Sequence, residues 1–183
     1  TGTSYIDVFE NSQSSIDIRN SSAWSLSSTP TGNPGSIDGY FSEAILSNDL
    51  KYGYNRAKLA WYVIDPLFQR NSSITPSHII NDSEQQENHY VREVFINEVF
   101  PNKDQQTGQP SRLRTLDLAF YPNERGPYNY DSYSTSYSAG ADPISGGLLD
   151  PVSRWGGVMR TLTTNDFEAA NIEFIQFWMM DPF

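Results

Sequence analysis

The stretch Asp166–Phe183, DFEAANIEFIQFWMMDPF, holds the densest apolar run of the chain and decides the fold that we expect. Large apolar side chains occupy both faces that a strand at Ile172–Met180 would present, and only Glu173 and Gln176 interrupt them. A strand that is apolar on both faces is covered on both faces, as in the centre of a sandwich or packed sheet. Pro182 has no N–H group to donate to a sheet, so we expect the strand to end before it.

A second strong strand is predicted at Arg56–Ile64, where apolar residues alternate from Ala57 to Val63. The glycines Gly156–Gly157 beside a tryptophan predict a bulge or a close backbone approach. Shorter strand patterns cover Thr3–Phe9, Ser14–Arg19, Ala23–Ser27, Leu113–Tyr121 and Trp155–Leu162.

One helix is predicted, over Ser77–Val99, with Asn81 or Ser83 as its N-cap. Several short strands and a single surface helix favour an all-β fold with minor α content. Within that class, we expect a β-sandwich of jelly-roll or galactose-binding-like type. The length of 183 residues suits one domain over 1–183, and the chain opens within a strand-like pattern, as a fragment of a much larger chain would.

Composition narrows the chemistry. The chain has no cysteine, which excludes disulfides, thiolate metal sites and cysteine nucleophiles. Its formal net charge is -10, so nucleic acid and anionic lipid would both be repelled. It also lacks a run of about 20 apolar residues, so we expect no transmembrane helix.

A long loop at 122–150 is rich in tyrosine, serine and glycine, and Gly126–Leu148 within it is predicted to be an exposed excursion. Aromatic side chains exposed in a polar loop would serve to bind a partner, so one interpretation is a contact loop. The alternative is a loop that is merely ordered or mobile and contacts no partner. The candidate partner-contact residues are Tyr128, Tyr130, Tyr133 and Tyr137.

No catalytic constellation stands out. Asp166 and Glu168 would share one face of a strand, as a glycosidase pair requires of its two carboxylates, but turn and solvent-facing roles are the simpler interpretation. His78 and His89 have no third metal ligand nearby in the sequence. No serine lies in a Gly-x-Ser-x-Gly elbow. We therefore assign no catalytic residue, no metal ligand and no cofactor-binding residue.

Two binding alternatives stay open. A structural calcium site could use Asp38, Asp49 or Asp131 with backbone carbonyls, although hydrogen-bonded loop aspartates explain them as well. The four tryptophans could stack on sugars, as in a carbohydrate-binding module. Core packing is the better interpretation for Trp61 and Trp178, because they lie in the most apolar strands.

Eight strings of the chain carry a resemblance to a known family. They are YGYNRAKLAWY at 52–62, IDPLF at 64–68, HYVREV at 89–94, EVFPNK at 98–103, NERGPYN at 123–129, RWGGVMR at 154–160, DFEAAN at 166–171 and FWMMDPF at 177–183. In order and in spacing, from roughly Ile16 to Phe183, they resemble the SprA family, the giant outer-membrane translocon of the type IX secretion system in Bacteroidetes, which also supports gliding motility.

The resemblance implies a very large β-barrel pore for protein export, with soluble insertions and accessory subunits around it. This chain would be one segment, a non-catalytic structural or docking domain in a soluble portion on the periplasmic or extracellular side of the outer membrane. Its implied partners are other parts of the translocon barrel, the accessory subunits and secreted cargo. A carbohydrate-binding module is the alternative function.

Overall fold

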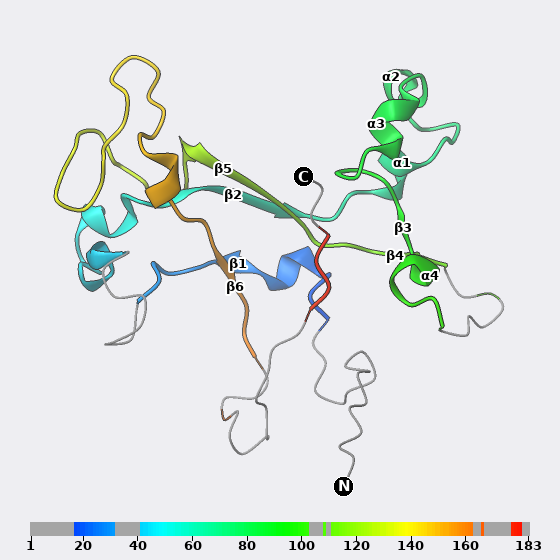
Figure 1. The fold of residues 1–183 in the computed structure, drawn as a ribbon, viewed down its shortest axis with the longest axis horizontal. Coiled ribbons are helices and arrows are strands. Elements are labelled where there is room, and N and C mark those ends of the chain that lie inside the picture. Colours follow the sequence, from blue (N-terminus) through cyan, green and yellow to red (C-terminus); the bar gives the residue numbers. More distant parts are fainter. Residues whose placement is uncertain are drawn as a thin grey trace, which may run out of the picture. The chain divides into compact units, whose positions relative to one another are not determined.

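The computed structural model describes residues 17–31, 41–102, 108, 111–162, 166 and 177–180. Short helices and small antiparallel sheets make up these ranges, in agreement with the predicted mostly-β class with minor α content (Figure 1). The contacts divide the chain into two compact units, which we describe separately. Unit 1 comprises Thr1–Ser21, Val63–Leu116 and Thr161–Phe183, and unit 2 comprises Ser22–Tyr62 and Asp117–Arg160.

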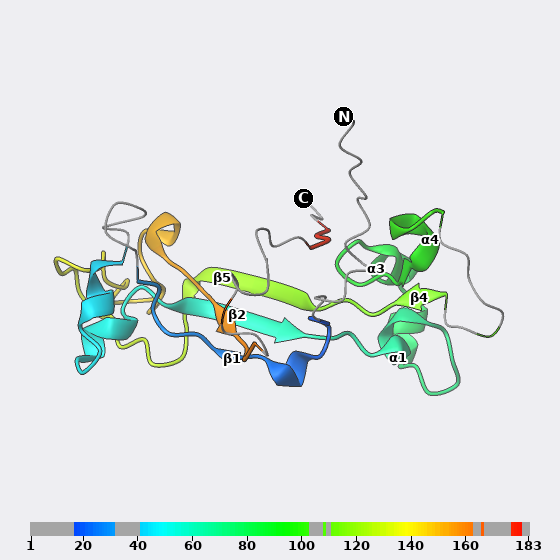
Figure 2. The same ribbon diagram turned by 90° about the horizontal axis from the view of Figure 1, so that it is seen from below.

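A two-stranded antiparallel ribbon is the longest regular element of unit 2. Strand β2 (Ala57–Tyr62) lies along β5 (Asp117–Arg125) in both views (Figures 1 and 2). The register runs from Tyr62 opposite Asp117 to Lys58 opposite Tyr121, and then shifts so that Ala57 faces Arg125. Pro122 lies in the bulged part of β5, where no ladder N–H is needed. The strand predicted at Arg56–Ile64 is thus confirmed.

The strands predicted at Ala23–Ser27 and Trp155–Leu162 shrink to one short antiparallel pair, β1 (Ser25–Leu26) and β6 (Val158–Met159). The predicted strand at Trp155–Leu162 is shortened because the backbone of Trp155 pairs with residues 55–57. Its N–H donates to the Asn55 carbonyl at 3.0 Å, and its carbonyl accepts from the Ala57 N–H at 2.7 Å. The 3-10 turns of this part of the chain are η2 (Ser21–Ala23), η3 (Ser42–Ile45), η4 (Leu50–Gly53) and η5 (Pro151–Ser153).

In unit 1, the single helix predicted at Ser77–Val99 is wrong. The side chain of Asp82 accepts a hydrogen bond from the Gln85 N–H, which starts a new helix after Asn81 has ended the previous one. Such local side-chain bonds compete with helix continuation. The N-cap is therefore Asp82 rather than Asn81 or Ser83. The elements observed are α2 (Ser77–Ile80), α3 (Ser83–Glu87), β3 (Val94–Phe95) and α4 (Ile96–Val99).

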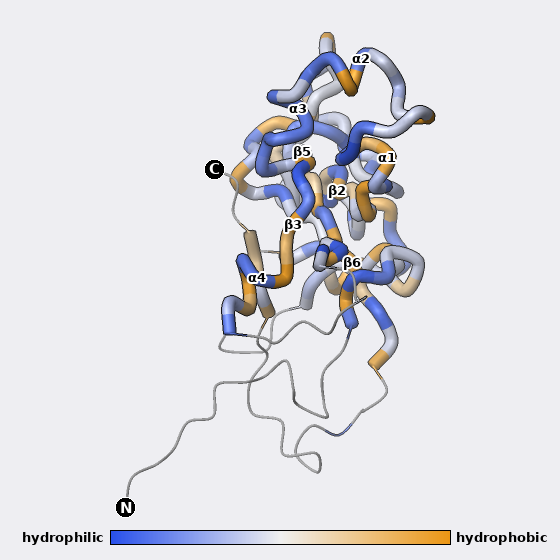
Figure 3. Tube along the Cα trace, turned by 90° about the vertical axis from the view of Figure 1, so that its right-hand side faces the viewer, coloured by the Kyte–Doolittle hydropathy of each residue, from blue (hydrophilic) through white to orange (hydrophobic). Residues whose placement is uncertain are grey.

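Two further elements complete the described part of unit 1. Helix α1 (Pro66–Gln69) begins at Asp65, whose side chain accepts from the Leu67 N–H at 2.8 Å. Strand β4 (Arg112–Leu113) pairs with β3, whose apolar residues continue into α4, as the orange of Figure 3 shows. The strand predicted at Leu113–Tyr121 therefore splits into β4 and β5.

The described part of the closing stretch differs from the prediction. Phe177–Met180 forms no strand, and its four side chains are exposed, Phe177 by 64%. Trp178 packs edge-on against Phe100 with ring centroids 5.8 Å apart, yet remains 59% exposed, so its predicted core role is wrong. Apolar periodicity identifies a segment that would gain from burial, but it does not supply the covering layer. Residues 172–176 lie outside the described ranges.

The amino-terminal stretch also differs from the prediction. Asp17–Arg19, the described end of the strand predicted at Ser14–Arg19, is exposed and forms no strand. The carboxylate of Asp17 instead pairs with the Arg19 guanidinium at 2.6 Å. A short local ion pair of this kind satisfies both charges without a neighbouring strand. The strand predicted at Thr3–Phe9 lies outside the described ranges.

The close approach predicted near Gly156 is observed, and it brings the glycine backbone against two side chains. A Cβ atom there would lie 2.9 Å from Cβ of Leu59 and 3.0 Å from the Phe120 ring, which is closer than real side chains approach. Gly126 is tighter still, because its Cβ would overlap the backbone carbonyl of Ala57.

We expect Gly126→Ala to lower the free energy of unfolding by about 2 kcal/mol or more, since backbone atoms have to shift to admit the methyl group. Gly147→Ala is the matched control, because a Cβ there meets nothing closer than 3.4 Å. Chemical denaturation followed by tryptophan fluorescence measures both variants. Equal stability of the two would contradict the close approach.

Candidate functional site: the tyrosine loop and its buried support

The segment Gly126–Leu148, which its composition predicts to be an exposed excursion, is exposed only in part. In Figure 1 it forms the yellow loops that follow the end of β5. Several of its residues are buried, and the backbone of Leu148 is tied to the β5 bulge by a 2.8 Å hydrogen bond to the Asn123 carbonyl. The buried members include Asn129, Asp131, Ser138, Ala141 and Leu148.

A fully buried ion pair supports this loop. The guanidinium of Arg154 lies 2.8 Å from a carboxylate oxygen of Asp131, and neither side chain is exposed to solvent. The remaining N–H groups of Arg154 donate to three backbone carbonyls at 2.8–2.9 Å. A buried charge is tolerated when it is paired and its other donors are satisfied. The three carbonyls belong to Tyr54, Gly140 and Leu149.

Two neighbouring polar residues extend the network. The other carboxylate oxygen of Asp131 accepts from the Ser138 hydroxyl at 2.8 Å. Asn129 donates its amide N–H groups to the carbonyls of Tyr54 and Arg56, and its amide oxygen accepts from the Asp131 N–H. The loop is therefore fastened to the chain at 54–56, directly before β2.

Tyrosine side chains alternate with these inward residues. Tyr128 is 70% exposed, Tyr130 56% and Tyr133 68%. Tyr137 differs, because it is half-buried and its backbone carbonyl accepts from the Asn55 side chain at 2.7 Å. Three of the four candidate contact residues thus present their side chains to solvent from an ordered support. Their role in contacting a partner remains a prediction.

A second buried carboxylate, Glu43 on η3, was not anticipated from the sequence. One of its oxygens accepts from the Asn55 amide at 2.8 Å, and the other has no hydrogen-bond partner among the described residues. Burial raises the pKa of Glu43, and the Asn55 hydrogen bond and the charge of Arg154 oppose this shift only in part. Neither Glu43 nor Arg154 carries a sequence signal, since charged residues are rarely buried.

The tryptophans have dissimilar surroundings. Trp155 is buried, packs edge-on against Phe41 at 5.9 Å, and lies 5.1 Å from the Arg56 guanidinium. Trp24 faces the guanidinium of Arg160 at 5.5 Å, and Trp61 is half-buried in β2. Trp155 thus has the core role, and Trp61 has it in part.

The other candidates are accounted for individually. Asp49 caps η4 by accepting from the Lys51 N–H, and Asp131 belongs to the buried ion pair. His89 accepts from Arg92 at 3.2 Å. Within the described ranges, no group of three or more His, Cys, Asp or Glu side chains could hold a metal ion. His78 and Asp166 are exposed, and Asp38 and Glu168 lie outside the described residues.

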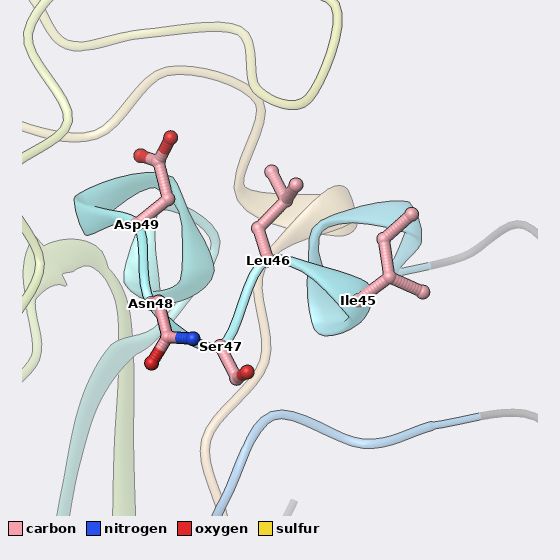
Figure 4. Close-up of a pocket in the computed structure, with 5 residues that line it drawn as sticks. All are labelled: Ile45, Leu46, Ser47, Asn48 and Asp49. Carbon is pink, nitrogen blue, oxygen red and sulfur yellow. The ribbon is translucent and has the colours of Figure 1, made fainter.

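A shallow hollow lies between η3 and η4. Ile45, Leu46, Ser47, Asn48 and Asp49 line it, and in Figure 4 the side chains of Leu46 and Asp49 point one way while those of Ser47 and Asn48 point the other. Side chains that diverge in this way cannot converge on a ligand, so we assign the hollow no role.

Comparison with models of known protein families and with curated proteins finds no match to this chain. None of the helices in the described ranges has both the length and the apolar character needed to cross a bilayer.

Removing the charge of Asp131 should leave the guanidinium of Arg154 buried without a counter-charge. We expect Asp131→Asn to cost about 3–5 kcal/mol of unfolding free energy, measured by chemical denaturation. The double variant Asp131→Leu/Arg154→Met should lose less stability than the single variants Asp131→Leu and Arg154→Met added together, because no uncompensated charge remains. Lys58→Ala, which breaks the exposed pair with Glu124, serves as the control and should change stability little. Additive losses in the double variant would contradict a coupled pair.

Glu43 predicts a pH dependence. Because its pKa is raised above the ordinary value of 4.5, the folded state holds the proton more tightly than the unfolded state does. The stability that this proton contributes is fully present below pH 4.5, and it is lost as the pH rises through the raised pKa of Glu43. Glu43→Gln mimics the protonated form, so the stability of this variant relative to the parent should increase as the pH rises. Thermal melts of both proteins at a series of pH values from below 4.5 upwards would measure the difference. A difference that does not change with pH would contradict the assignment.

Proposed function

We propose that this chain is a non-catalytic structural and docking domain of an outer-membrane protein translocon similar to SprA, acting in protein secretion and gliding motility. The exposed apolar surface of the β2/β5 ribbon carries this proposal. The sequence strings that resemble the SprA family support the same assignment. The domain would lie in a soluble portion of the translocon, on the periplasmic or extracellular side.

The ribbon exposes apolar side chains on both of its faces. On one face, Leu118 is 58% exposed and Phe120 44%; on the other, Tyr62 is 41% exposed and Tyr121 42%. Between Lys58 and Tyr62, β2 has no strand neighbour other than β5 within the described ranges. A two-stranded ribbon of this kind is marginally stable unless another layer covers it.

A translocon would provide that layer. Its remaining segments and accessory subunits would cover the ribbon, whose two strands would become part of a larger β-sandwich of jelly-roll type. Secreted cargo would then pass beside the domain without being altered. We propose no cofactor for this role.

The buried charges favour a structural role over catalysis. Asp131 and Arg154 have their hydrogen-bonding capacity occupied by each other and by neighbouring groups, and neither is exposed to a substrate. A catalytic acid or nucleophile has to reach its substrate. Buried charges whose hydrogen bonds are all made instead hold the backbone around them in one conformation.

A carbohydrate-binding module is the second candidate, and the exposed aromatic rings are the observation that favours it. The tryptophans that first suggested this function support it less, because Trp155 is buried and Trp61 half-buried. A glycan array probed with the purified chain separates the two functions. Specific glycan binding that depends on an exposed ring would favour the module and count against the translocon role.

The translocon proposal predicts that Leu118→Ser/Phe120→Ser, introduced into the full-length translocon, lowers the amount of a marker cargo reaching the medium. The two serines remove the apolar surface that the covering layer would bury. Ile144→Ser is the matched control, because Ile144 is 96% exposed but lies in the loop rather than on the ribbon. Normal secretion by the ribbon variant, with the protein present at normal amounts, would contradict the proposal.

A further inference from the structure

Tyr128 has an unusual backbone conformation. It occupies the third position of the turn Gly126–Asn129, which is closed by a 3.2 Å hydrogen bond from the Asn129 N–H to the Gly126 carbonyl. Its φ is 61°, in the left-handed region. Turns with proline second and a positive φ third usually place glycine or asparagine at that third position. A bulky residue there costs conformational free energy.

Burial of the Tyr128 side chain does not offset this cost, because 70% of it is exposed. The turn is instead held by its backbone. The guanidinium of Arg56 donates to the Pro127 carbonyl at 3.0 Å, and the Tyr128 carbonyl lies so near Gly53 that a Cβ on Gly53 would come within 2.5 Å of it. The surrounding structure thus keeps an exposed aromatic ring in a strained position.

The composition around Tyr128 is that of a protein-binding loop. The run 126–140, GPYNYDSYSTSYSAG, consists mostly of tyrosine, serine, glycine and asparagine. These residues dominate antibody contact loops, where tyrosine supplies large contact area at low entropic cost and the small residues supply adaptable hydrogen bonds. The buried ion pair beneath this run holds it in one arrangement before any partner arrives, which lowers the cost of binding.

Charge and polarity distinguish between partner classes. Asp131 is the sole ionisable acid or base of 126–140 apart from the tyrosines, and its charge is buried against Arg154. The run itself therefore offers a charged partner no exposed ionic group to pair with. The two planar polar side chains of the run, Asn129 and Asp131, both turn inward, so none remains beside the rings to orient the hydroxyl groups of a sugar.

We propose that Tyr128, Tyr130 and Tyr133 form a preorganised surface that binds an uncharged, apolar segment of a polypeptide partner. Ring contacts and hydrogen bonds supply the affinity, and ionic attraction does not. This inference goes beyond the translocon role and does not depend on it.

A phage-displayed library of short random peptides, selected on the purified chain, provides the test. The triple variant Tyr128→Ser/Tyr130→Ser/Tyr133→Ser is used to remove peptides that bind elsewhere. We expect the selected peptides to be apolar, and their affinity to change little between about 0.05 M and about 0.5 M sodium chloride. Tyr128→Asn should weaken binding about tenfold or more, since exposed tyrosines at interfaces are frequent hot spots.

The melting temperature of Tyr128→Asn separates a binding role from a structural one. Asparagine tolerates a positive φ, so this variant should melt at the same temperature as the parent or above it while losing affinity. Tyr90→Asn, at an exposed tyrosine of unit 1, is the control and should retain peptide binding.

Three results would overturn the proposal. The first is a failure to select peptides that distinguish the parent from the triple variant. The second is a Tyr128→Asn variant that melts well below the parent. The third is binding of glycans rather than peptides in a parallel array, with the binding lost in the triple variant.

Discussion

The buried pair between Arg154 and Asp131 is the interaction on which unit 2 depends. The arginine lies just before Trp155, whose backbone pairs with the chain entering β2, and the aspartate lies in the tyrosine loop. One guanidinium thereby joins segments that are far apart in the sequence. Replacing such a pair with apolar residues is often harmless, but losing one partner is not. Its value lies in fixing a single arrangement of the loop.

This arrangement gives unit 2 an unusually polar interior. Glu43, Asn55, Arg56 and Asp131 are all buried, while the cluster of buried apolar residues consists of Ala57, Ala141 and Leu148. Glu43, Asn55 and Arg56 each keep one buried polar atom without a partner among the described residues, whereas the network around Asp131 is satisfied. A satisfied buried network of this kind tolerates few alternative packings. The same rigidity lets the loop carry exposed rings in fixed positions. Stability and presentation of the tyrosines therefore come from the same residues.

Whereas many polar groups are buried, several large apolar side chains are exposed. The ribbon and the residues Phe177–Met180 place large apolar side chains in solvent, where they contribute little to stability. In the proposed translocon, burial of these side chains would come from neighbouring segments and subunits. Such a division of labour, with polar groups buried inside and apolar groups left for assembly, is physically consistent with a docking domain.

Local sequence patterns determined the strand at β2, the close approach at Gly156 and the exposure of Tyr128, because alternation, glycine and turn composition act over a few residues. Tertiary structure decided the rest. The pairing of Trp155 with the chain before β2 shortened a predicted strand, and the side chain of Asp82 divided a predicted helix. Burial of Asp131 required Arg154, 23 residues away, and no local pattern encodes a partner at that separation.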